Sequence, residues 1–136
     1  MDIIIQIKII QTDSDGQTQV IKFETPATIV IKGDSTYINY KEKSVDTGEL
    51  TKTSIKVNKD SINIIRFGDF SSNISFNEKR DYSCQYETPY GTIDMNIVTN
   101  KLFKQIENDN IEISLDYNIN LDEKNTMNNK FSIISK

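Results

Sequence analysis

The chain has 136 residues and a mass of 15.6 kDa, so we expect one domain over residues 1–136. Ile, Val and Thr number 40 together, whereas Ala occurs once and Leu four times, which favours β-strands over helices. The sequence contains no histidine, which removes the commonest general base and metal ligand. The net charge is −4 and the 16 basic residues are spread along the chain, which excludes a typical nucleic-acid-binding protein.

The apolar N-terminal segment of residues 1–10 is interrupted by Gln6 and Lys8, with no basic region before it and no small-residue cleavage site after it. This pattern predicts a strand rather than a signal peptide. No run approaches the roughly 18 to 20 apolar residues of a membrane helix. The single cysteine, Cys84, has no internal disulfide partner. We therefore expect a soluble, cytoplasmic protein that binds neither membrane nor nucleic acid.

Apolar residues recur at every second position along the chain, which is the period of a strand with one buried face. The clearest example is the odd-numbered series Ile111, Ile113, Leu115, Tyr117, Ile119 and Leu121, with polar residues between its members. The predicted strands lie at about 3–10, 18–25, 27–32, 36–42, 51–57, 61–67, 71–76, 82–88, 92–99, 101–106, 111–121 and 127–135.

Two features leave the strand number between ten and twelve. The segments 18–25 and 27–32 form either two strands or one strand bent at Pro26, and 101–106 has the only claim to a helical turn. Short turns rich in Gly, Asn and Asp separate the segments, which predicts antiparallel neighbours. Successive hairpins favour a closed barrel over a Greek-key sandwich, and closure removes exposed edges. The predicted fold is all-β, a single antiparallel meander β-barrel of about 8–12 strands.

The order of several short motifs resembles the YwiB-like or DUF1934 family of bacterial proteins. The motifs are Thr-Tyr-Ile-Asn-Tyr-Lys-Glu at 36–42, Thr-Ser-Ile-Lys-Val at 53–57, Ile-Arg-Phe-Gly at 65–68, Phe76, Tyr-Glu-Thr-Pro-Tyr-Gly at 86–91, and Thr99. The resemblance implies a calycin-like (lipocalin-like) barrel, a small cytoplasmic protein of low-GC Gram-positive bacteria (Firmicutes), and no established activity. Calycin barrels often hold small apolar ligands, which is an analogy at the level of the fold.

The odd or even position of a residue along a strand, called its parity here, decides which face its side chain occupies. Parity indicates a candidate ligand pocket. Glu42 shares a face with Ile38 and Tyr40, and Arg66 shares a face with Ile62 and Ile64. If both faces point inward, Arg66 either pairs with Glu42 or receives an anionic head group through its planar fork. The neighbouring pair Ile64-Ile65 also allows the opposite parity, which would turn Arg66 outward. The candidate pocket residues are Glu42, Arg66, Tyr40, Tyr82 and Tyr86, in which the tyrosines add hydroxyl groups beside an apolar wall.

Two functions remain open at this point. The first is a binding module that holds a small apolar or amphipathic ligand inside the barrel. The alternative is a non-catalytic module that docks a protein partner or a second copy through its outer surface or sheet edge. Its basis is a set of apolar residues with outward parity: Ile4, Ile10, Val20, Val30, Val98, Phe103 and Ile134. We find no catalytic constellation, cofactor motif or metal-ligand spacing, and expect neither enzyme activity nor a cofactor.

Overall fold

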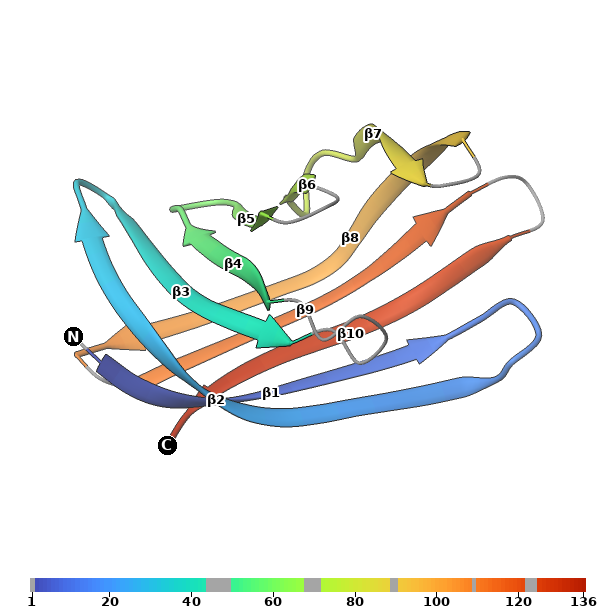
Figure 1. Cartoon of the computed structure of the whole chain (residues 1–136). Helices are drawn as coiled ribbons and strands as arrows, with labels where there is room; N and C mark the ends of the chain where they lie inside the picture. Colours follow the sequence, from blue (N-terminus) through green and yellow to red (C-terminus); the bar gives the residue numbers. More distant parts are fainter. Residues whose placement is uncertain (1, 44–49, 68–71, 89–90, 109, 122–124) are drawn as a thin grey trace.

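A computed structural model of the chain describes residues 2–43, 50–67, 72–88, 91–108, 110–121 and 125–136, leaving aside the side chains of residues 43 and 86–88. Figure 1 shows the long strands β8, β9, β10 and β1 side by side, with the shorter strands β3 to β6 opposite them. The ten strands are β1 (Asp2–Thr12), β2 (Thr18–Lys32), β3 (Ser35–Lys43), β4 (Leu50–Val57), β5 (Ile62–Phe67), β6 (Ser72–Phe76), β7 (Tyr82–Thr88), β8 (Gly91–Glu107), β9 (Asn110–Asn120) and β10 (Thr126–Ser135).

All ten strands belong to one antiparallel sheet with the order β6-β5-β4-β3-β2-β1-β10-β9-β8-β7. Consecutive strands pair with each other except β6 and β7, and β1 also pairs with β10, which joins the two ends of the chain. The sheet curls into a nearly closed barrel whose break falls between β6 and β7 (Figure 1). The predicted all-β meander barrel is confirmed, and its seam lies in the middle of the sequence rather than at the termini.

The core follows from the alternation of side chains along each strand. Odd-numbered residues of β1 and β9 and even-numbered residues of β3 and β5 point to the same interior. Ile5, Ile38, Ile55, Ile64 and Ile113 are each at most 4% exposed. Such β-branched side chains suit a pleated surface packed on one face. The core also contains Ile7, Ala27, Ile29, Tyr40, Val57, Ile62, Phe76, Ile97, Ile111, Leu115, Phe131 and Ile133.

Two irregularities explain why ten strands form rather than twelve. Strand β2 runs unbroken through Pro26, which pairs with Ile4 of β1, while its ladder to β3 begins only at Ala27. Proline has no amide hydrogen to donate, so the second ladder starts after it. In β8, the register to β9 shifts between Thr99 and Lys101, so a bulge joins the two predicted segments. Residues 101–106 are therefore strand, not a helical turn.

The first hairpin shows how local chemistry makes a turn. The Asp13 carboxylate accepts hydrogen bonds from the backbone amides of Asp15 and Gln17, both at 2.9 Å. Gly16 has φ of 83°, a conformation that glycine adopts without a steric penalty. This turn between β1 and β2, at Asp15-Gly16, is one of the short turns rich in Gly, Asn and Asp that the sequence predicts between strands.

Candidate functional site

Arg66 lies on the inward face of β5. It occupies the same parity as the buried residues Ile62 and Ile64, and it is itself partly buried. Phe67, on the opposite parity, is 53% exposed. Of the two orientations that the sequence left open for Arg66, the structure shows the inward one. The pairing of β5 with β4 sets this orientation, because it places Arg66 opposite the buried Thr53.

Arg66 belongs to a cross-strand row that also contains two well-buried residues with hydroxyl groups. In the register, Tyr40 of β3 faces Thr53 of β4, and Thr53 faces Arg66 of β5. Tyr40 is 4% exposed and Thr53 is 1% exposed. Glu42, two residues beyond Tyr40 on the same face, is partly buried and faces Thr51. Three of the five predicted residues, Tyr40, Glu42 and Arg66, are therefore brought to the same inward face.

The charges of this row act on two tyrosines. Burial raises the pKa of the Tyr40 phenol above its usual range; the negative charge of Glu42 adds to the effect and the positive charge of Arg66 opposes it. Burial also raises the pKa of Tyr117 on β9, where Arg66 again opposes the shift. The positive charge of Arg66 therefore acts on phenols from two strands, β3 and β9, that lie far apart in the sheet order. Both phenols stay neutral at physiological pH and are able to donate a hydrogen bond.

Several interior polar atoms form no hydrogen bond of normal geometry within the described part of the chain, although Glu42 and Thr53 lie close enough to the Tyr40 phenol to affect its pKa. These atoms are Tyr40 Oη, Thr53 Oγ1 and Asn129 Nδ2. Asn129, 1% exposed, faces Tyr117 across the β10–β9 ladder. A buried polar group without a partner costs roughly 1–3 kcal/mol. These three atoms therefore mark a place where a ligand or water would supply missing hydrogen bonds.

Arg66 and Glu42 form no ion pair with each other in the structure; among the described residues, the one ion pair joins Lys136 to Glu24. Arg66 also donates no hydrogen bond to another described residue. A partly buried guanidinium with five donors and no ion pair to a described carboxylate suits an anionic group.

The remaining two predicted residues have different outcomes. The Tyr82 hydroxyl donates a hydrogen bond to the backbone oxygen of Asn73 at 2.8 Å, and its partly buried ring packs against the core. Its hydroxyl therefore links β7 to β6 rather than joining the Arg66 row. The side chain of Tyr86 lies outside the described residues.

Three residues of this interior were absent from the predicted pocket: Thr53, Tyr117 and Asn129. Tyr117 carries a usable signal, because it alternates in phase with Leu115 and Ile119 and so had to face the core. Its ring packs against Phe76 of β6, with 4.5 Å between ring centroids and 53° between planes. Thr53 and Asn129 carry no such signal, because polar residues on strands usually face water.

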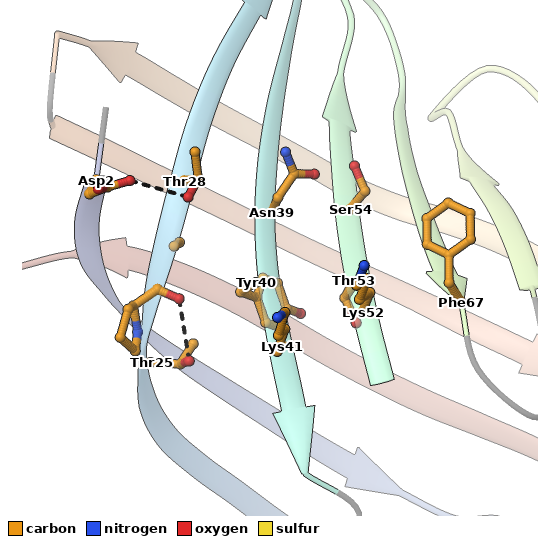
Figure 2. A pocket seen from close by; sticks show the side chains of 12 residues that line it. Asp2, Thr25, Thr28, Asn39, Tyr40, Lys41, Lys52, Thr53, Ser54 and Phe67 are labelled. Carbon is orange, nitrogen blue, oxygen red and sulfur yellow. Dashed lines mark hydrogen bonds between the residues drawn. The ribbon is translucent and has the colours of Figure 1, made fainter. Parts of the chain in front are cut away.

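A separate hollow of about 720 Å³ lies on β2 to β5, shown in Figure 2 and called here the outer groove. Of the predicted residues only Tyr40 lines it. Most of its walls have outward parity, so it lies on the other side of the sheet from Arg66. The lining residues are Asp2, Thr25, Pro26, Ala27, Thr28, Asn39, Tyr40, Lys41, Lys52, Thr53, Ser54 and Phe67.

Other kinds of site are not seen in the part of the chain that the structure describes. Those residues contain no group of three or more Cys, Asp or Glu side chains able to hold a metal ion. No helix among them has the length and apolar character needed to cross a bilayer.

The ten-stranded antiparallel meander defines this chain as a small β-barrel protein. The chain belongs to the family described as "Domain of unknown function (DUF1934)", whose profile matches residues 5–133. It is similar to the "Uncharacterized beta-barrel protein YwiB" of Bacillus subtilis, with 25% identity over 118 residues, covering 86% of this chain and 82% of the relative. The fold resembles the crystal structure of the ywiB protein from Bacillus subtilis, with a TM-score of 0.78 and 20% identity over 99% of this chain and 93% of that one.

Proposed function

We propose that the barrel binds a small amphipathic molecule with an anionic head group held at Arg66. The observation that carries this proposal is an interior arginine without an ion-pair partner among the described residues, in one cross-strand row with the Tyr40 and Thr53 hydroxyls, which form no hydrogen bond of normal geometry there. A carboxylate or phosphate would neutralise the guanidinium and accept the two hydroxyl protons. The isoleucine-rich wall around this row would contact the apolar part of the ligand.

The size of the barrel supports the same proposal. Barrels of about eight strands are either filled by side chains or hold one small ligand, and interior width grows with strand number. This barrel has ten strands and an incomplete seam between β6 and β7. Arginine, tyrosine and threonine bind a head group by charge and hydrogen bonds, so the proposed role is to hold a molecule rather than to transform it.

Native mass spectrometry of the protein purified from the organism that encodes it tests this function. We expect the wild type to retain a small molecule and the Arg66→Gln variant to lose it. Arg80→Gln is the matched control, because Arg80 is exposed in the turn before β7 and should leave the bound mass unchanged. A wild type without any bound mass, or equal retention by Arg66→Gln, contradicts the proposal.

A second candidate function is docking of a protein partner on the outer surface. It is favoured by Ile4, Val20, Phe103 and Ile134, which have outward parity and are 46–57% exposed. Ile10, Val30 and Val98, of the same predicted set, are partly buried. A stoichiometric protein in the same native spectrum, lost in an Ile4→Asp variant but kept by Arg66→Gln, would support this alternative.

A further inference from the structure

The outer groove runs across the strands between two parallel rows of outward side chains. One row is polar: Thr28 faces Asn39, and Asn39 faces Ser54. The other row lies two residues away from the first on each strand, and in it Lys41 of β3 faces Lys52 of β4. Phe67 faces Lys52 and ends the second row. Figure 2 shows both rows on neighbouring strands, with the Phe67 ring at one end and Thr25 near the other.

The pairing of Lys41 with Lys52 is unfavourable for the protein alone. Like charges directly opposite each other on neighbouring strands destabilise a sheet. Neither ammonium has a carboxylate partner among the described residues, and the two acids of β1 and β2 are already engaged. Asp2 accepts a hydrogen bond from Thr28 at 3.2 Å, and Glu24 pairs with Lys136.

The same face carries further positive charge although the whole chain has a net charge of −4. Lys32 and Lys56 both lie over the ring of Tyr37, at 5.9 and 5.7 Å from its centroid. The only acid in the sequences of β3 and β4 is Glu42, which lies on the inward face. The fold therefore collects on one outer face lysines that are dispersed along the sequence.

The groove also offers apolar surface and free hydrogen-bonding groups. Phe67 is 53% exposed, and Pro26 is exposed at the β2 side of the groove. The side chains of Asn39 and Ser54 have no hydrogen-bond partner within the described residues, so both are available to a ligand. At about 720 Å³ the hollow matches the usual size of a small-molecule site, roughly 300–1,000 Å³.

We propose that the outer groove binds a small amphipathic anion. Its charged group lies between the ammoniums of Lys41 and Lys52, where it relieves their mutual repulsion, and its apolar body lies against Phe67. This site goes beyond the interior one, because Lys41 and Lys52 occupy the face of the sheet opposite Arg66. Tyr40 and Thr53 lie on the strands that separate the two sites, so the test uses substitutions at Lys41, Lys52 and Phe67, which belong to the outer groove alone.

The fluorescent probe 8-anilinonaphthalene-1-sulfonate, which joins an apolar aromatic body to one anionic group, tests the proposal by titration of the intact protein. We expect one saturable site whose dissociation constant rises about three- to tenfold in Lys41→Gln, in Lys52→Gln and in Phe67→Ala. Lys56→Gln is the matched control, because Lys56 lies on the same strand face outside the groove lining. Arg66→Gln separates this site from the interior one: any probe bound inside the barrel should be lost in this variant, whereas the binding that depends on Lys41, Lys52 and Phe67 should persist.

Several outcomes overturn the proposal. One is the absence of saturable binding, and another is equal loss in Lys56→Gln and Lys52→Gln, which would indicate a general charge effect. Loss of probe binding in Arg66→Gln alone would indicate that the probe binds inside the barrel. Full displacement by inorganic phosphate at constant ionic strength would show that charge alone, without the apolar body, determines binding. Far-ultraviolet circular dichroism of each variant confirms that a change in binding does not arise from unfolding.

Discussion

The phenolic hydroxyl of Tyr82 donates a hydrogen bond to the backbone oxygen of Asn73, with 2.8 Å between the two oxygens. Asn73 lies on β6 and Tyr82 on β7, the two strands at the ends of the sheet order. Between these strands the described residues contain no backbone ladder. A second bond across the same seam runs from the amide of Asn77 to Thr99 Oγ1 at 3.2 Å. Individual side-chain bonds therefore hold together the one break in the barrel.

Tyr82→Phe should weaken this seam while keeping the ring in the core. We expect a loss of about 1 kcal/mol in the free energy of unfolding, the typical worth of one hydrogen bond, measured by urea denaturation. Amide hydrogen exchange should accelerate in β6 more than in β1. Tyr37→Phe is the matched control, since the Tyr37 hydroxyl has no partner among the described residues. Equal stability of wild type and Tyr82→Phe would show that the seam bond contributes nothing.

Tyr40→Phe should act in opposite directions on stability and on binding. Removing a buried hydroxyl that forms no hydrogen bond of normal geometry with a described residue relieves its desolvation cost, so the ligand-free protein should gain about 1 kcal/mol in urea denaturation. The proposed interior ligand should be retained less well, because it loses a donor. A destabilisation of the ligand-free protein would indicate that Tyr40 Oη is satisfied, by water for example.

Lys52→Glu should replace a repulsive cross-strand pair with an attractive one. We expect the free energy of unfolding to rise by about 0.2–1 kcal/mol at low salt. The gain should shrink in 1 M NaCl, where the screening length is about 3 Å. Probe binding in the outer groove should be lost in the same variant. If Lys52→Glu were more stable but bound the probe as well as the wild type does, the Lys41–Lys52 pair would not be part of the binding site.

The pKa of Asp116 is the basis of a prediction about acid stability. Burial alone would raise this pKa, but hydrogen bonds and neighbouring charges outweigh it and lower the pKa. The carboxylate accepts hydrogen bonds from Asn128 at 2.9 Å and Asn100 at 3.2 Å, and Lys130 and Lys101 lie nearby.

Because the folded-state pKa is depressed, ionised Asp116 stabilises the protein fully above the unfolded-state pKa and loses this effect as pH falls through the folded-state value. Asp116→Asn should therefore be less stable at pH 7, by less than about 1 kcal/mol since the group is largely solvated. The difference from wild type should shrink as the pH falls toward the lowered pKa, in urea denaturation measured across pH 2–7. A difference that does not change with pH would contradict the assignment.

Phe76 should be a major contributor to the barrel core. It is 1% exposed and its ring contacts Tyr117 on a strand far from its own in the sheet order. Phe76→Ala should cost about 3–5 kcal/mol in the free energy of unfolding. Phe103→Ala, at a position that is 48% exposed, should cost much less in the same measurement. Comparable losses at both positions would contradict the inward packing of β6.

Much of the strand pattern could be predicted because its cause is local. Alternation in 111–121 and the turn at Asp15-Gly16 depend only on neighbouring residues, and both appear in the structure. The sequence left the number of strands open. The unbroken strand through Pro26 and the bulge after Thr99 both depend on how these residues pair with a neighbouring strand. The parity of Arg66 was undecided for the same reason, since Ile64 and Ile65 are equally able to enter a core.

The sequence by itself determined the secondary-structure class and the antiparallel hairpins, since a period of two and short turns are properties of adjacent residues. The tertiary structure alone decided the register, and register follows from pairings such as Ile5 with Ser135 at opposite ends of the chain. Those pairings place Arg66 inside with Tyr40 and Thr53. They also bring Lys41 and Lys52 together outside, from strands separated by a turn, to form a charged groove that no segment of the sequence contains.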